Sequence, residues 1–157
     1  ASHMEVIEAV ERVNEAQKSV VFHKIVKAVG DVKGKVVTIL GLAFKPETDD
    51  MRDAPALVVI DQLKKAGVGE IRVFDPIAME ECKRRLGDSV TYCQNIYDAA
   101  DGADVLALLT EWRQFRMPSW NVIKKVMRGN VIVDGRNIYN REELEENGFV
   151  YTRIGEE

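Results

Sequence analysis

Short apolar runs that alternate with helix-like stretches constrain the fold of this chain most strongly. From residue 35 onward, each run has the length of a strand, and the run at 105–109 is apolar throughout, as expected for a strand covered on both faces. The pattern predicts strands at 36–40, 71–74, 90–92, 105–109, 131–133 and 149–151. It predicts helices at 54–66, 79–86, 95–100, 121–127 and 142–146. This alternation indicates an α/β fold with a Rossmann-like, doubly wound parallel sheet.

The first thirty residues follow a different pattern. Residues 5–29 contain no glycine or proline and repeat apolar side chains at helical spacing, so we predict one long helix that ends near Gly30. We expect this helix to be a peripheral element rather than part of the α/β core. Residues 1–4 read as a remnant of an expression vector and are left out of the fold prediction.

Composition excludes several classes of function. The 157 residues suit one domain, and the net charge of −4 argues against a nucleic-acid partner, which calls for a basic face. Cys82 and Cys93 have neither a disulfide framework nor metal-ligand spacing, so we expect reduced thiols in a cytoplasmic protein. No apolar run approaches the roughly 20 residues of a membrane helix, so we expect no membrane partner.

The end of the first predicted strand is where we first expect a ligand. The apolar run 36–40 stops at Gly41, and Phe44, Lys45 and Arg52 follow it. In open α/β sheets, ligands bind just outside the carboxyl ends of the strands. Because two of these three side chains are cations, the ligand is predicted to be an anion.

Lys45 and Phe44 each have two interpretations. Pro46 disfavours a helix at Lys45, so the ammonium group lies on an extended loop from which it can reach a phosphate. The alternative is a solvated surface lysine. Phe44 either packs against a nucleotide or belongs to the hydrophobic core.

Arg52 lies among carboxylates that precede a predicted helix. It either clamps a phosphate through two parallel hydrogen bonds or neutralises one of the acids at the helix start. A metal site is disfavoured, because no histidine or second acidic cluster supports it. The acids are Glu47, Asp49, Asp50 and Asp53.

Arg136 and Asp75 follow other predicted strands. Arg136, in the segment 134–137, projects from the same edge as Lys45, so the two cations are placed to converge on a diphosphate; alternatively, Arg136 pairs with Asp134 or a neighbour. Asp75 stands where dinucleotide-binding folds hold a ribose. Because G-L-A-F-K-P replaces the fingerprint G-x-G-x-x-G, we interpret Asp75 as part of a strand-ending turn.

Four segments together resemble one known family. They are VNEAQK at 13–18, GLAFKPETDDMRDAP at 41–55, TEW at 110–112 followed by Phe115, and DGRN at 134–137. In this order, over residues 5–155, they are similar to the C-terminal domain of the UDP-glucose/GDP-mannose dehydrogenases. The resemblance implies that residues 5–30 are the end of a central dimerisation helix and that residues 31–157 bind a nucleotide sugar.

The resemblance also implies roles for single residues. Phe44, Lys45 and Arg136 would contact the UDP-sugar substrate, and Arg52 would lie towards the cofactor NAD. Enzymes of that family oxidise a sugar-nucleotide alcohol to a carboxylic acid with two NAD, through a cysteine in a glycine-rich motif. Neither that motif nor the NAD fingerprint occurs in this chain. We therefore expect no catalytic residue here and an N-terminal NAD-binding half elsewhere in the same protein.

Other functions remain open from the sequence. Within the resemblance, Thr110–Trp112 favours UDP-glucose over UDP-N-acetylmannosamine or GDP-mannose. A stand-alone module that binds a nucleotide or nucleotide sugar is the alternative from another class. A flavodoxin-like signalling domain ranks last, because its acidic cluster and phosphoacceptor arrangement are not evident.

Overall fold

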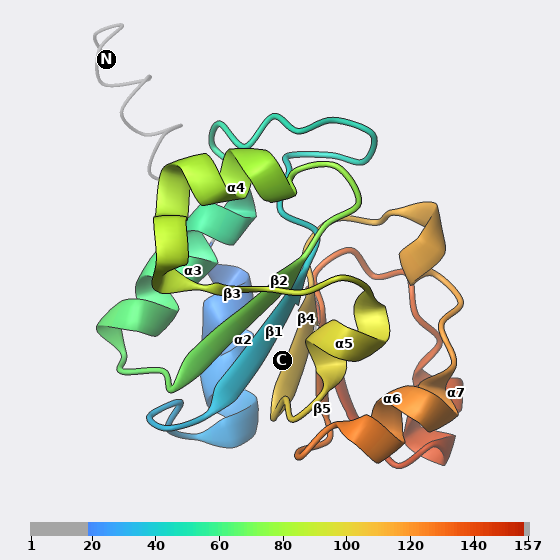
Figure 1. Ribbon diagram of the computed structural model, residues 1–157. Coiled ribbons are helices and arrows are strands. Elements are labelled where there is room, and N and C mark those ends of the chain that lie inside the picture. Colours follow the sequence, from blue (N-terminus) through green and yellow to red (C-terminus); the bar gives the residue numbers. More distant parts are fainter. Residues whose placement is uncertain (1–18, 156–157) are drawn as a thin grey trace, which may run out of the picture.

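A computed structural model describes residues 19–155 of the chain (Figure 1). The expected vector remnant at 1–4 and the expected helical residues 5–18 lie outside this range, as do residues 156–157. In the described part, no helix is long and apolar enough to cross a bilayer.

A parallel sheet forms the centre of the described part of the chain. Its six strands have the order β3-β2-β1-β4-β5-β6, and every neighbouring pair is parallel. This is the strand order of a doubly wound Rossmann sheet, so the predicted fold class is confirmed. The strands are β1 (Val36–Leu40), β2 (Glu70–Phe74), β3 (Thr91–Tyr92), β4 (Val105–Leu108), β5 (Val131–Asp134) and β6 (Val150–Arg153).

Helices connect the strands at the predicted places, with ends that differ from the prediction by at most two residues. Two short 3₁₀ turns were not predicted, at Gly87–Ser89 and Arg113–Phe115. The α-helices are α2 (Val20–Val29), α3 (Pro55–Lys65), α4 (Met79–Leu86), α5 (Ile96–Ala100), α6 (Trp120–Val126) and α7 (Arg141–Glu146).

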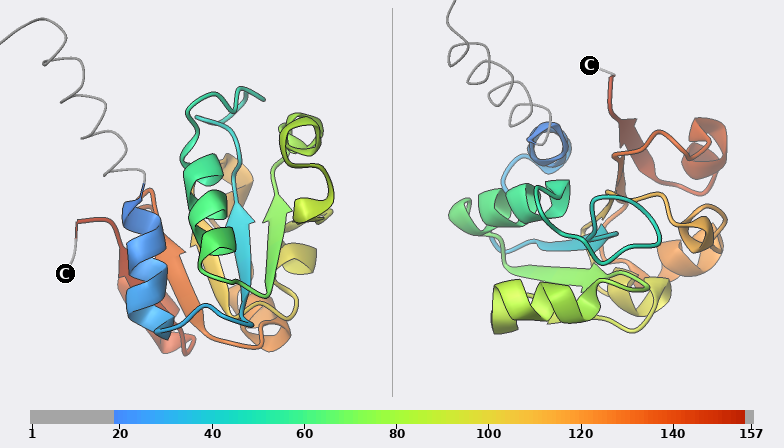
Figure 2. Two further views of the ribbon diagram at one scale, coloured as in Figure 1. Left: turned by 90° about the vertical axis from the view of Figure 1, so that its left-hand side faces the viewer. Right: turned by 90° about the horizontal axis from the view of Figure 1, so that it is seen from above.

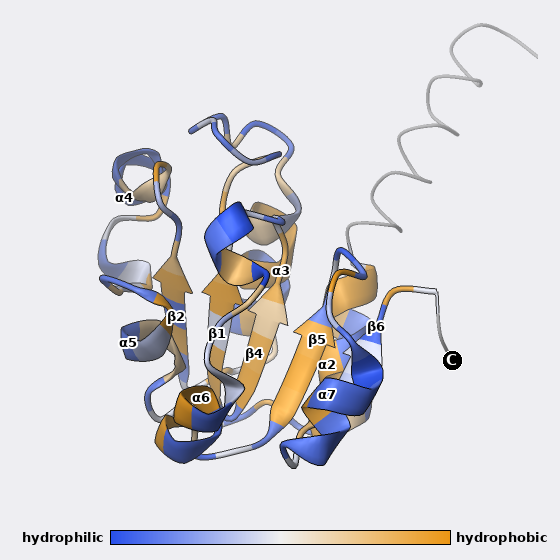
Figure 3. Cartoon of the chain, turned by 90° about the vertical axis from the view of Figure 1, so that its right-hand side faces the viewer, coloured by the Kyte–Doolittle hydropathy of each residue, from blue (hydrophilic) through white to orange (hydrophobic). Residues whose placement is uncertain are grey.

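Each face of the sheet has its own apolar core, because successive side chains of a strand point to opposite faces. Val37 and Ile39 of β1 belong to the core beneath α2 and α3, whereas Leu40 belongs to the core beneath α5, α6 and α7. Figure 2 shows α2 and α3 together on one side of the sheet. In Figure 3 the central strands β1, β4 and β5 are mainly hydrophobic and the outer helix α7 is hydrophilic.

The helix α2 lies against the sheet, which corrects the expectation of a peripheral helix for residues 20–29. Val21 and Ile25, one helical turn apart, are buried in the same core as the strands. The helix contacts β5, β6 and α3. The physical reason is that α3 alone leaves the β5 side of this face uncovered, and the apolar stripe of α2 buries it.

Asp104 joins the amino ends of two neighbouring strands. Its carboxylate accepts a hydrogen bond of 2.8 Å from the backbone N–H of Val36 and pairs with the guanidinium of Arg128. The hydrogen bond from Arg128 is the main reason that the pKa of Asp104 is lowered, and the Val36 N–H adds to it.

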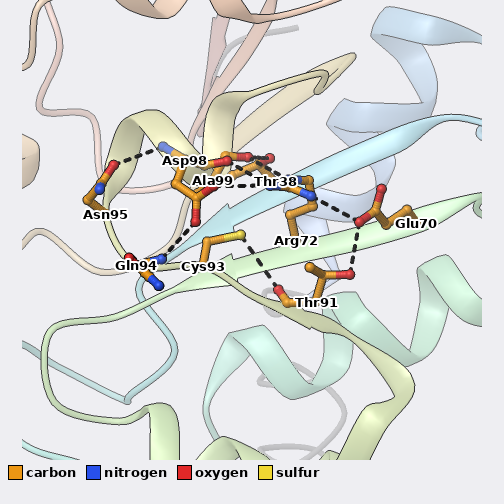
Figure 4. A network of polar contacts seen from close by, with 9 residues as sticks. All are labelled: Thr38, Glu70, Arg72, Thr91, Cys93, Gln94, Asn95, Asp98 and Ala99. Carbon is orange, nitrogen blue, oxygen red and sulfur yellow. Dashed lines mark hydrogen bonds and ion pairs between the residues drawn. The ribbon is translucent and has the colours of Figure 1, made fainter.

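A polar network fixes α5 to the sheet (Figure 4). The guanidinium of Arg72 on β2 donates to the carbonyl oxygens of Asp98 and Ala99 and pairs with Glu70. The hydroxyl of Thr38 donates to the same Ala99 carbonyl. A cation at the carboxyl end of a helix satisfies carbonyl groups that have no helical partner.

We predict that Arg72→Met lowers the free energy of unfolding by about 2 kcal/mol, because it removes hydrogen bonds from a charged donor that is only 17% exposed. The matched control is Arg84→Met on α4, whose guanidinium is 67% exposed and whose loss is expected to change the stability much less, because water screens the pair. Urea unfolding of both variants measures the difference. Equal losses would contradict the role of the Arg72 network.

We further predict a pH dependence from Asp104. Its pKa is lower in the folded chain than the ordinary value of an aspartate, about 3.9, so its contribution to stability is complete above that value and is lost as the pH falls through the folded pKa. Asp104→Asn should therefore be less stable than the parent at pH 7, and the difference in the free energy of unfolding should shrink as the pH falls below about 4. Urea titrations across this range test this, with Asp101→Asn, an exposed acid, as control. A gap that stays constant would contradict the prediction.

Candidate functional site

Four loops follow the carboxyl ends of the strands and gather at one edge of the sheet, at the top of Figure 1. In a parallel sheet all carboxyl ends share one edge. The loops span residues 41–54 after β1, 75–78 after β2, 109–119 after β4 and 135–140 after β5.

The loop after β1 begins with a close approach between two strands. Gly41 has φ = 91°, and a Cβ atom there would lie 2.5 Å from the Cβ of Thr110. Only glycine fits this backbone and this contact. The Thr110 hydroxyl then donates a 2.8 Å hydrogen bond to the carbonyl oxygen of Ala43. The residues before Phe44 and Lys45 are therefore held against the end of β4.

Asp75 holds the same loop from the other side. One carboxylate oxygen accepts from the backbone N–H groups of Leu42 and Ala43, and the other accepts from those of Ile77 and Ala78. Asp75 is 1% exposed. The interpretation of Asp75 as part of a strand-ending turn is confirmed, and both oxygens are occupied, so it does not have the free carboxylate that would bind a ribose.

Phe44 and Lys45 project from this loop into solvent. Phe44 is 58% exposed, so the alternative that it belongs to the core is wrong. Its backbone N–H donates to the carbonyl oxygen of Asp50, which closes the loop on itself. Lys45 is exposed and forms no ion pair with any residue in the described range 19–155.

Arg52 lies at the far end of the loop and is paired with an acid. Its Nε and one terminal nitrogen donate to the two carboxylate oxygens of Asp50, at 3.0 and 2.9 Å. This side-chain hydrogen bond is the main cause that lowers the pKa of Asp50 to about 2. The structure therefore has Arg52 neutralising a neighbouring acid, and an incoming phosphate would have to share or displace Asp50.

Asp134 fixes the loop that carries Arg136. It is fully buried and accepts from the backbone N–H groups of Arg136 and Tyr139, at 3.0 and 2.8 Å, and from the hydroxyl of Tyr151, at 2.7 Å. Gly135 approaches the end of β4 so closely that a Cβ atom would lie 2.5 Å from the carbonyl oxygen of Leu108. The loop has little freedom as a result.

The side chain of Arg136 pairs with Glu111 on the neighbouring loop. The contact joins the Arg136 Nε to Oε2 of Glu111. The sequence left open whether Arg136 pairs with Asp134 or with another neighbour. The side chain of Arg136 pairs with Glu111, and Asp134 accepts a hydrogen bond from the backbone N–H of Arg136. Sequence reasoning missed Glu111, although the carboxylate stands directly at the end of a predicted strand.

The contacts arrange the four predicted site residues along one edge. Ala43 contacts Thr110, and Glu111 contacts Arg136, so the loops that carry Lys45 and Arg136 are connected through the end of β4. Phe44 and Lys45 share one loop with Arg52, which lies next to the start of α3. The edge thus presents exposed cations from two loops held by the same central strand.

Trp112 and Phe115 belong to the core below this edge. Both are buried, and Phe115 stacks edge-on against Phe74 at a centroid distance of 5.9 Å. The indole N–H of Trp112 is buried without a hydrogen-bond partner among residues 19–155.

Neither thiol has the environment of a reactive nucleophile. Cys82 and Cys93 are buried and free. Burial raises the pKa of both thiols, that of Cys93 to about 11, so the thiolate form is scarce at neutral pH. No cluster of histidine, cysteine and acidic side chains within the described residues could hold a metal ion.

A protein-family model and several known proteins match this chain. The model of the UDP-glucose/GDP-mannose dehydrogenase family, UDP binding domain, matches residues 38–141. UDP-glucose 6-dehydrogenase TuaD of Bacillus subtilis is 38% identical over 149 residues, which cover 95% of this chain and 32% of that protein. The chain thus spans about a third of the length of this curated relative.

Solved structures give the same result. A UDP-glucose dehydrogenase from the archaeon Pyrobaculum islandicum superimposes with a TM-score of 0.77 at 33% identity, covering 94% of this chain and 32% of that one. A UDP-D-ManNAc dehydrogenase from Pyrococcus horikoshii superimposes with a TM-score of 0.69 at 27% identity, covering 90% and 30%. The chain belongs to the UDP-glucose/GDP-mannose dehydrogenase family and comprises its UDP binding domain.

Proposed function

We propose that the carboxyl edge of this domain binds the UDP part of UDP-glucose within a UDP-glucose 6-dehydrogenase, which oxidises UDP-glucose to UDP-glucuronate with two NAD. The observation that carries the proposal is the presence of two exposed cations, Lys45 and Arg136, on loops tied to the end of the same strand. Two cations from different loops match the two phosphates of a nucleoside diphosphate.

Each predicted substrate residue has a distinct part in the proposal. Lys45 is a mobile point charge for one phosphate, and Arg136 is a planar donor that can bind a phosphate through two hydrogen bonds. Phe44, exposed next to Lys45, offers an aromatic face to the nucleotide. These contacts act by binding and orienting the substrate, and none is catalytic.

For NAD we propose a single contribution, from Arg52. The chain lacks the glycine fingerprint after β1, and both oxygens of Asp75 are already bonded, so the usual dinucleotide position of this fold does not fit NAD here. The side chain of Arg52 is 81% exposed, and it can extend towards a ligand if its ion pair with Asp50 breaks. NAD supplies the hydride acceptor, and its main binding site would lie in other parts of the enzyme.

The remaining parts of the enzyme are also proposals. An N-terminal NAD-binding half of the same protein would carry the catalytic cysteine, and the helix that includes α2 would contribute to a homodimer. We place the enzyme in the cytoplasm, where buried free thiols such as Cys82 and Cys93 stay reduced. Its uronate product would serve polysaccharide biosynthesis.

A second candidate substrate is UDP-N-acetylmannosamine. The observation in its favour is the superposition on the UDP-D-ManNAc dehydrogenase of P. horikoshii. UDP-glucose is favoured, because TuaD shows the higher identity, 38% against 27%. GDP-mannose and a non-catalytic nucleotide-binding module rank below both.

We predict that Lys45→Ala weakens the binding of UDP to this chain about tenfold, because one charge-assisted hydrogen bond contributes about 1.5–3 kcal/mol and 1.4 kcal/mol is a factor of ten. Lys125→Ala, an exposed lysine on α6, is the control and should leave the affinity unchanged. Titration calorimetry or NMR measures both. Equal affinities for the parent and Lys45→Ala would exclude Lys45 from the site.

We predict that the longer enzyme forms two NADH for each UDP-glucose and that this chain alone forms none. Absorbance at the NADH band is measured with UDP-glucose, UDP-N-acetylmannosamine and GDP-mannose in parallel. NADH from a different sugar nucleotide would correct the substrate, and NADH from this chain alone would refute the assignment of catalysis to another part of the protein.

Arg52 has its own prediction in the longer enzyme. Arg52→Ala should raise the KM for NAD and leave the KM for UDP-glucose nearly unchanged, because its charge is proposed to face the cofactor. Arg84→Ala, on the exposed side of α4, is the control. A rise in the KM for UDP-glucose alone would move Arg52 to the substrate side.

A further inference from the structure

Glu111 is a carboxylate at the proposed phosphate site that the proposed function does not use. It follows Thr110 on the loop after β4, and its side chain is only 21% exposed. Its Oε2 atom is buried, forms an ion pair with the Nε of Arg136 and has no hydrogen-bond partner within residues 19–155. A buried carboxylate oxygen next to a site for an anion is unfavourable by charge alone, so its presence calls for a physical explanation.

The pair holds Arg136 at both ends. At the backbone, the Arg136 N–H donates to Asp134, which is fully buried and also accepts from Tyr139 and Tyr151. At the side chain, Nε is paired with Glu111. Within residues 19–155 the two terminal amino groups of Arg136 form no hydrogen bond, and the side chain is 45% exposed.

This arrangement leaves free the part of the guanidinium that binds phosphate. Arginine carries five N–H donors in a planar fork, and fixing Nε orients the two amino groups. A free arginine side chain loses rotamer freedom when it is immobilised, and this loss opposes binding. An arginine held before the ligand arrives loses less of it upon binding.

We propose that Glu111 is a positioning residue, which holds the Arg136 guanidinium so that its amino groups face a diphosphate at the carboxyl edge of the sheet. The proposal rests on the proposed function, because it requires Arg136 to contact the phosphates. Glu111 itself does not touch the ligand.

A purely electrostatic effect of Glu111 and a positioning role of Glu111 predict opposite changes in UDP affinity for Glu111→Gln. Glu111→Gln removes a negative charge near the anion, so a purely electrostatic neighbour would make UDP bind more tightly. If Glu111 positions Arg136, the same change releases the guanidinium and UDP binds less tightly. The sign of the change therefore separates the two.

The experiment titrates this chain with UDP and, separately, with inorganic pyrophosphate. The variants are E111Q, E111D, R136A and the double variant E111Q/R136A, with E142Q on the exposed side of α7 as matched control. We expect R136A to weaken binding about tenfold or more, since charge-assisted hydrogen bonds are lost. We expect E111Q to weaken it severalfold, E111D to do so less, and E142Q to have no effect.

A double-mutant cycle shows whether Glu111 acts through Arg136. In the R136A background, E111Q should no longer weaken binding, because there is no guanidinium left to position. Urea unfolding of every variant confirms that it is folded. If E111Q weakens binding equally with and without Arg136, Glu111 does not act through Arg136 and the proposal is overturned.

A ligand-free measurement tests the positioning independently. The Nε–H of Arg136 should give a separate NMR signal with slow solvent exchange in the parent and in E142Q, and this signal should be lost in E111Q. A signal unchanged by E111Q would overturn the proposal.

The outcomes separate this inference from the proposed function. If R136A weakens binding while E111Q leaves it unchanged or strengthens it, the positioning role is wrong and the proposed function stands. If R136A has no effect, the assignment of Arg136 to the phosphates is wrong, and the positioning role falls with it. A parent chain that binds neither UDP nor pyrophosphate contradicts both.

Discussion

Two buried aspartates, Asp75 and Asp134, determine the shape of the carboxyl edge. Each ends a strand and accepts hydrogen bonds from backbone N–H groups of the loops beyond it. A buried carboxylate is stable only when its oxygens are satisfied, and a loop that leaves a sheet needs acceptors for its N–H groups. Each aspartate fulfils both requirements at once, so loops without regular secondary structure are held in one conformation. The positions of Lys45 and Arg136 depend on these two loops.

The same constraint separates what this domain can bind from what it cannot. In a dinucleotide-binding fold, the acidic residue after the second strand binds a ribose hydroxyl. Here both carboxylate oxygens of Asp75 accept hydrogen bonds from backbone N–H groups of the protein itself. Asp75 therefore offers no free carboxylate oxygen to a ligand, whereas Lys45 and Arg136 are exposed at the same edge. This suits a diphosphate, and it explains why a domain with Rossmann strand order is proposed to hold the substrate while NAD is proposed to bind mainly elsewhere.

The two arginines of the site differ in how they are paired with acids, and this difference is consistent with the different roles proposed for them. Arg52 uses its Nε and one terminal nitrogen on Asp50 at the surface, where the pair is screened by water. Arg136 forms an ion pair through Nε with a carboxylate oxygen of Glu111 that is buried. The first pair can be exchanged for a ligand at little cost, and the second can persist while a ligand binds.

Periodicity and turn signals alone determined the order of strands and helices, the parallel sheet and the edge at which Phe44, Lys45, Arg52 and Arg136 lie, because each depends on local spacing and on chain direction. The family was also visible in segments such as 41–55. Only the tertiary structure decided that Phe44 is exposed, that α2 packs on the sheet, and that Glu111 is the partner of Arg136. These features depend on contacts between residues far apart in the chain, such as the 25 positions between Glu111 and Arg136, and no local pattern encodes them.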